Sequence, residues 1–201
     1  MSASGMLVTG FGPFPGVGWN PSGWLVQTLA RTHARPLTGA VLPVSWQSAW
    51  AALEPLLEAA RPRQVILFGV SQEATGFCLE KRAYNARGPH ADVDGASPKD
   101  HRLLPSPVET LNATLPLEPI ASTVAAADIP VALSEDPGRY LCNALFFHTL
   151  HWAHGTSTRV GFVHIPHIAE SGPLTRAQAL RGARLIVETA ARAEQTAPVT
   201  A

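Results

Sequence analysis

Charged side chains are scarce in this sequence, and neither sign dominates. Only 15% of its 201 residues are charged, against about 25% in an average soluble domain. Fifteen basic residues balance fifteen acidic ones, so the basic excess of a general nucleic-acid binder is missing. With 46% hydrophobic residues, the composition also excludes intrinsic disorder. We therefore expect a folded protein with no nucleic-acid partner, and burial of apolar surface in a homo-oligomer is one way to keep so uncharged a chain in solution.

Long apolar runs are also missing. No charged residue precedes Arg31, and an uncharged N-terminal stretch raises the question of a membrane segment. Gly10, Pro13 and Pro21 interrupt it, so no run of the ~20 apolar residues that a membrane helix needs is present. A basic segment followed by an apolar block, as in a secretion signal, is absent as well. The sequence predicts neither a membrane partner nor export.

Cysteine is rare, with Cys78 and Cys142 as the two examples. The pair could form one disulfide. Without an export signal, two free thiols in a reducing compartment are the better expectation. The sequence thus predicts a cytoplasmic protein.

Short apolar runs rich in β-branched residues alternate with longer helical patterns. Strands are expected at 6–11, 40–44, 65–70, 129–133 and 160–165, and helices from Ser22 to Leu29, from Ser45 to Leu57, and at 116–127, 140–152 and 175–193. This alternation is typical of an α/β layer fold with a mostly parallel sheet. The long Gly-, Pro- and Asp-rich segment 71–107 is either functional or contains short strands. The tail after about residue 193 is expected to fray.

Three chemically capable side chains follow predicted strands. In open α/β sheets, ligands bind beyond the carboxyl ends of the strands. Glu80 follows the third strand, Cys142 follows the strand that ends near Ser134, and His164 lies at the end of the last strand. We expect the three to lie on one functional rim.

Cys142 is the strongest candidate because it lies where a helix begins. The thiolate is the nucleophile in cysteine chemistry, and a helix N-terminus lowers the pKa of a thiol. The free N–H groups there can also form an oxyanion hole. The alternative is a small buried hydrophobe, which is the common role of a lone cysteine.

His164 and Glu80 complete the candidate group. His164 can act as a base toward a thiol and as an acid toward a leaving amine, and Glu80 can orient the imidazole. The alternatives are a histidine that only hydrogen-bonds a loop and a surface glutamate paired with Lys81 or Arg82. His148, His151 and His154 share one helix, but no carboxylate or thiol accompanies them, and a polar stripe is preferred over a metal site.

Four segments, in order and spread over almost the whole chain, resemble one family. They are residues 8–14 with 20–22, Glu80 with Ala83 and Asn85, residues 138–143, and residues 161–166. Together they are similar to the pyroglutamyl peptidases, also called pyrrolidone-carboxylate peptidases. The resemblance implies a cytosolic cysteine peptidase and, over residues 1–201, a single-domain three-layer α/β/α sandwich around a mostly parallel twisted sheet.

The resemblance also implies roles for individual residues. It assigns a catalytic triad to Glu80, Cys142 and His164, and it implies a pyroglutamyl-peptide substrate without a metal or other cofactor. Phe11 and Phe14 would pack on the pyroglutamyl ring, Asn20 would help to hold the pocket, and Leu141 would line it. The family is often oligomeric, so a homo-oligomer, as a tetramer or a dimer, is expected.

Some positions depart from the family's pattern. The acids of Glu135-Asp136-Pro137 replace a small neutral run, Gly12 stands where many relatives have an acid, and Val70 where many have glutamine. Arg87 is a poor match for the family's arginine. Two alternatives therefore stay open: a cysteine amidase acting on another small cyclic or acyl amide, and a catalytically silent relative that binds a small ligand. Exposed-looking tryptophans favour the second, namely Trp19, Trp24, Trp46 and Trp50.

Overall fold

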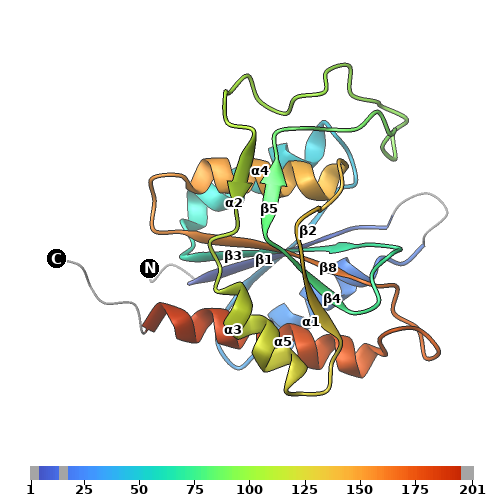
Figure 1. Ribbon diagram of the computed structural model, residues 1–201, viewed down its shortest axis with the longest axis vertical. Helices are drawn as coiled ribbons and strands as arrows, with labels where there is room; N and C mark the ends of the chain where they lie inside the picture. The colour runs from blue at the N-terminus through green and yellow to red at the C-terminus, as the bar shows by residue number, and fades with distance from the viewer. Residues whose placement is uncertain (1–4, 14–17, 196–201) are drawn as a thin grey trace.

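A six-stranded sheet organises the chain in the computed structural model, which describes residues 5–13 and 18–195 (Figure 1). The elements in chain order are β1 (Met6–Phe11), α1 (Pro21–Thr32), β2 (Thr38–Leu42), α2 (Ser48–Ala60), β3 (Gln64–Val70), β4 (Phe77–Glu80), β5 (Arg82–Tyr84), β6 (Thr110–Asn112), α3 (Leu117–Ala125), β7 (Val131–Ser134), α4 (Leu141–Ala153), β8 (Arg159–Ile165) and α5 (Arg176–Gln195). β5 and β6 form a separate two-stranded sheet. Phe14, predicted to contact substrate, and the tail from residue 196 lie outside the described residues.

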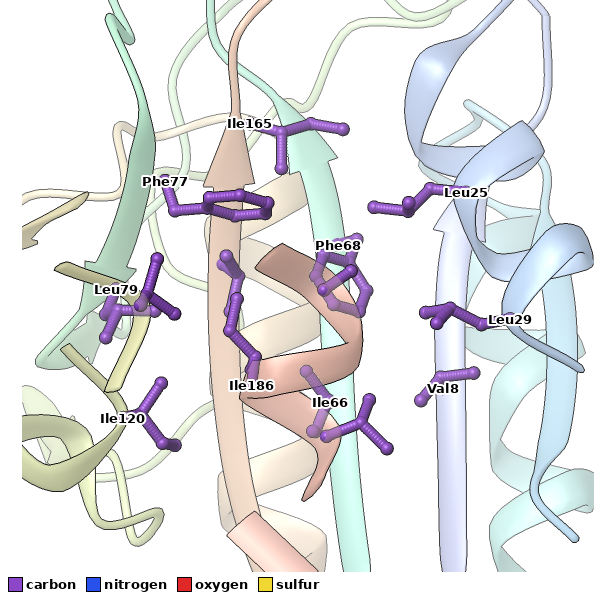
Figure 2. Packing of buried hydrophobic residues seen from close by; sticks show 14 of the residues in the cluster. Val8, Leu25, Leu29, Ile66, Phe68, Phe77, Leu79, Ile120, Ile165 and Ile186 are labelled. Carbon is purple, nitrogen blue, oxygen red and sulfur yellow. The ribbon is translucent and has the colours of Figure 1, made fainter. Parts of the chain in front are cut away.

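Helices cover both faces of the sheet. Helices α1, α3 and α5 lie on one face, and α2 and α4 on the other (Figure 1). Successive residues of one strand therefore enter different cores: Ile66 and Phe68 pack with α1 and α5 (Figure 2), whereas Val65 and Leu67 face α2 and α4. Burial on both faces explains the uncharged run of β3. The predicted three-layer α/β fold with a mostly parallel sheet is confirmed.

The strand order is β2-β1-β3-β8-β4-β7. The first four strands are parallel, as expected, but β4 is antiparallel to β8 and β7 is parallel to β4. The strands that reach Glu80 and Ser134 thus run opposite to the rest. The expectation that Glu80 and Cys142 follow strands whose carboxyl ends lie on the same rim as that of His164 is wrong in strand direction, although Glu80 still meets His164. A strand parallel to β3 would need a connection of about a dozen residues or more, usually with a helix. The connection 71–76 between β3 and β4 is shorter and contains no helix, so β4 runs in the opposite direction.

Most predicted elements are present, with shifted ends. Asn20, rather than Ser22, caps α1, because its side chain accepts the N–H of Ser22 and Pro21 takes the first helical position. The helix expected from Ser45 begins at Ser48. The segment 71–107 contains the short strands β4 and β5. Helix α5 continues to Gln195, past the predicted point of fraying.

The tryptophans are less exposed than their positions in the sequence indicate. Trp19 and Trp24 are half-buried against the core beneath α1 and α5, and Trp46 and Trp50 are half-buried against the core beneath α2 and α4. The expected exposed tryptophan surface is therefore not found. Among the described residues, no helix combines the length and the apolar character needed to cross a membrane.

Candidate active site

Glu80 and His164 lie on adjacent antiparallel strands and meet beneath the start of α4. The register pairs Cys78 with His164, so Glu80, two residues further along β4, projects from the same face of the sheet. Oε1 of Glu80 lies 2.7 Å from Nδ1 of His164. Glu80 is 2% exposed and His164 is 7% exposed. Because a carboxylate can only accept, Nδ1 carries the hydrogen and Nε2 remains for another partner.

Cys142 is that other partner. Burial alone would lower the pKa of His164, but the negative charge of Cys142 and a hydrogen bond with its side chain outweigh it. The hydrogen bond and charge of Glu80 add to this effect, and the pKa of His164 rises to about 10. The imidazole is therefore positively charged at neutral pH, between a carboxylate and a sulfur.

Helix α4 positions the sulfur. Cys142 is the second residue of this helix, and Tyr140, its N-cap, makes no side-chain capping hydrogen bond. The first N–H groups of a helix have no partner within it, so they are available to an anion beside the thiol. Cys142 is half-buried, forms no disulfide and lines a surface pocket, which leaves it accessible to a ligand.

Asn143 fixes the start of α4 to the small sheet. Its Oδ1 accepts the N–H of Tyr84 over 2.8 Å, and its Nδ2 donates to the carbonyl oxygens of Tyr84 (2.9 Å) and Ala86 (2.7 Å). The side chain is fully buried, so these bonds are shielded from competing water. Asn143 belongs to a segment singled out in the sequence, yet its partner lies 59 residues away and cannot be read from a local pattern.

A pocket of about 540 Å³, here called the ring pocket, opens beside Cys142. Its lining is mostly apolar and includes the three residues Phe11, Asn20 and Leu141, which were predicted to bind substrate, together with Cys142. The amide of Asn20 already donates to the carbonyl of Gly12 and accepts from Ser22. Asn20 thus joins the loop after β1 to the start of α1 at the wall of the pocket.

The far wall of the ring pocket comes from the long segment after β5, which Asp92 anchors. The N–H groups of Trp46 (2.7 Å), Asp94 (2.9 Å) and Ala96 (2.9 Å) all donate to this carboxylate. Burial raises the pKa of Asp92, but these backbone hydrogen bonds, with one from Ser45, outweigh burial and hold the pKa below its usual value. Asp92 was not among the predicted site residues, because Trp46, the partner that ties this segment to the rest of the fold, lies 46 residues away.

The acids that depart from the family pattern have cationic partners. Glu135 pairs with Lys81 (2.7 Å) and Arg82 (3.2 Å), and the hydrogen bond from Lys81 and the charges of both cations lower its pKa. Asp136 pairs with Arg139 over 2.5 Å. These ion pairs offset the charge that would otherwise disfavour a thiolate. Lys81 and Arg82, the alternative partners considered for Glu80, therefore pair with Glu135 instead.

Other candidates lie away from this group. Arg87 pairs with Asp100 and does not line the ring pocket. His148 stacks on Trp50, and burial lowers its pKa to about 4. Within residues 5–13 and 18–195, no group of three His, Cys, Asp or Glu side chains could hold a metal ion.

Comparison with known proteins gives a consistent result. The family model described as pyroglutamyl peptidase matches residues 4–200. A pyrrolidone-carboxylate peptidase of Gloeobacter violaceus is 32% identical over 203 residues, covering 94% of this chain and 98% of its own. One of Thermococcus litoralis is 34% identical over 169 residues, covering 81% and 76%.

Solved structures agree with the sequence matches. The pyrrolidone carboxyl peptidase from Thermococcus litoralis superposes with a TM-score of 0.87 at 28% identity, covering 94% of each chain. Pyroglutamyl peptidase I of Bacillus amyloliquefaciens gives 0.86 at 26% identity, covering 93% of this chain and 96% of its own. Since the family model spans almost the whole sequence and the fold is shared, the chain belongs to the pyroglutamyl peptidase family.

Proposed function

We propose that this protein is a cysteine peptidase that removes the N-terminal pyroglutamyl residue from peptides, with Cys142 as nucleophile, His164 as acid and base, and Glu80 as the group that orients the imidazole. One observation carries the proposal: a buried carboxylate and a charged imidazole adjoin a thiol that opens onto an apolar pocket. Family membership supports the same assignment.

In the proposed reaction, the Cys142 thiolate attacks the carbonyl carbon of the pyroglutamyl residue. N–H groups at the start of α4 stabilise the oxyanion. His164 transfers its proton to the leaving amine as the C–N bond breaks, and a thioester remains on Cys142. The imidazole, now neutral, takes a proton from water, which attacks the thioester. Pyroglutamate leaves, and the thiolate and imidazolium are restored.

The ring pocket suits an uncharged lactam. A pyroglutamyl ring carries no charge, so a charged side chain facing it would lose hydration without gaining an ionic partner. Buried Phe11 and Leu141 supply apolar contact instead. Asp92, the acid in the lining, is occupied by its own backbone donors.

A pyroglutamyl amide reporter tests the proposal. Wild type should release the reporter, and Cys142→Ala should not, while its circular dichroism and thermal unfolding stay like those of wild type. Turnover by Cys142→Ala at the wild-type rate would reject the assignment. A panel of pyroglutamyl, prolyl and simple acyl amides separates the proposal from an amidase of different specificity.

Alkylation separates an enzyme from a silent binding relative. Iodoacetamide at pH 6 should label wild type rapidly at Cys142 and abolish activity, since an activated thiolate reacts where an ordinary thiol is inert. Cys78 should react slowly, because burial, together with the charge of Glu80, raises its pKa. Lack of labelling at Cys142 would favour the silent relative.

We also propose that the protein works in the cytoplasm and assembles with copies of itself. An unpaired nucleophilic thiol is best preserved in a reducing compartment. The low charge content supports self-association. Light scattering coupled to gel filtration measures the assembly, and a monomer at micromolar concentration would contradict it.

A further inference from the structure

A second hollow meets the ring pocket at the thiol. It has a volume of about 580 Å³, and among the described residues it shares only Val70, Gln72, Tyr140 and Cys142 with the ring pocket. Glu80 and His164 line this second hollow and do not line the ring pocket. The nucleophile therefore lies between two spaces, and the imidazole faces one of them.

We propose that this second hollow, here called the leaving-group pocket, receives the residue that follows pyroglutamate and selects lysine or arginine at that position. The inference rests on the proposed function. In that reaction His164 gives its proton to the leaving amine, so this nitrogen must come within hydrogen-bond reach of the imidazole. The side chain attached next to that nitrogen then enters the space that His164 lines.

The charge of the leaving-group pocket favours a cation. Glu73 and Asp136 line it, and no lysine or arginine of the described chain does. The Glu73 carboxylate has no ion-pair partner among the described residues. Asp136 engages Arg139 and the N–H of Gly138 through Oδ1 alone, which leaves Oδ2 available. The positive charge of His164 is already matched by Glu80 and Cys142.

A lysine ammonium or an arginine guanidinium carries several N–H donors and no acceptor. Such a side chain is the complement of a lining that offers the carboxylates of Glu73 and Asp136 and no lysine or arginine among the described residues.

The exposure of Glu73 limits how strongly the leaving-group pocket can prefer a cationic side chain. Glu73 lies at the surface, and exposed ion pairs contribute little individually. A cationic side chain nevertheless gains from Glu73, which is unpaired among the described residues, whereas the charge of Asp136 is already partly offset by Arg139. An acidic side chain is repelled by Glu73. We therefore expect kcat/KM to be about tenfold higher for a peptide with lysine after pyroglutamate than for one with glutamate.

Three peptides that differ only at this position, pyroglutamyl-Lys, pyroglutamyl-Ala and pyroglutamyl-Glu followed by one common sequence, provide the test. Release of pyroglutamate is followed by mass spectrometry. The lysine-to-glutamate ratio of kcat/KM should shrink in Glu73→Gln, invert in Glu73→Lys and decline with added salt. Glu54→Gln is the matched control, because Glu54 is an exposed glutamate of α2 outside this pocket, and it should keep the wild-type ratio.

The outcomes distinguish the two proposals. Cleavage of all three peptides with equal kcat/KM overturns the selectivity and leaves the proposed function intact. A preference that Glu73→Lys does not change overturns the role of Glu73 in the pocket. Failure to cleave any of the three overturns the proposed function, and the leaving-group pocket with it.

Discussion

The sulfur of Cys142 lies directly above Gly69. A Cβ placed on Gly69 would lie 2.8 Å from Sγ of Cys142 and 2.7 Å from Cζ of Phe162. Gly69 is paired in register with His164 on β8. The missing side chain therefore creates the space in which the thiol reaches the imidazole, and only glycine provides it at this point of β3.

Gly69→Ala should therefore impair catalysis more than folding. The added methyl group must displace the thiol or the Phe162 ring, and a misplacement of about 1 Å can cost on the order of 100-fold in rate. We expect kcat/KM for a pyroglutamyl amide to fall by about that factor. Gly5→Ala is the control, because a Cβ at Gly5 has no neighbour within 4 Å. Equal activity of the two variants would contradict the placement of the thiol over Gly69.

Glu80→Gln should shift the pH profile as well as the rate. The Glu80 carboxylate helps to raise the pKa of His164 to about 10, so its neutral replacement lowers that pKa. The alkaline limb of kcat/KM should move to lower pH, and the maximum should fall by about 10⁴-fold, as when the acid of an analogous triad is made neutral. A rate loss with an unmoved alkaline limb would mean that Glu80 acts only as packing.

Local patterns predicted β1, β2, β3, β7 and β8, the helix start near Cys142 and the strand end near His164, because each depends on neighbouring residues. They did not predict the reversal of β4, which brings Glu80 beside the imidazole from the opposite strand direction. Gly69 and Asp92 were also missed. Their roles depend on contacts with residues far along the chain, and an isolated glycine or aspartate in one sequence carries no signal of such contacts.

Cys142→Ser should lower the pKa of His164. The charge of Cys142 is the strongest of the effects that raise this pKa above its ordinary value of 6.5, and a serine hydroxyl stays neutral. NMR titration of the His164 ring should show an imidazolium persisting to about pH 10 in wild type and losing its proton at lower pH in the variant. An identical titration in both proteins would show that Cys142 is not the charged neighbour.

Asp92→Asn should loosen the wall of the ring pocket in a pH-dependent way. The carboxylate accepts three backbone N–H groups, and replacing it should cost about 1–3 kcal/mol of unfolding free energy at pH 7 and raise KM for the pyroglutamyl amide. Because the pKa of Asp92 is lowered in the folded protein, its contribution is present above the unfolded pKa of about 3.9 and is lost as pH falls through the folded value. The stability difference between wild type and Asp92→Asn, measured by urea unfolding, should therefore shrink in acid. A difference that stays constant down to pH 2 would mean that the carboxylate charge does not hold the loop.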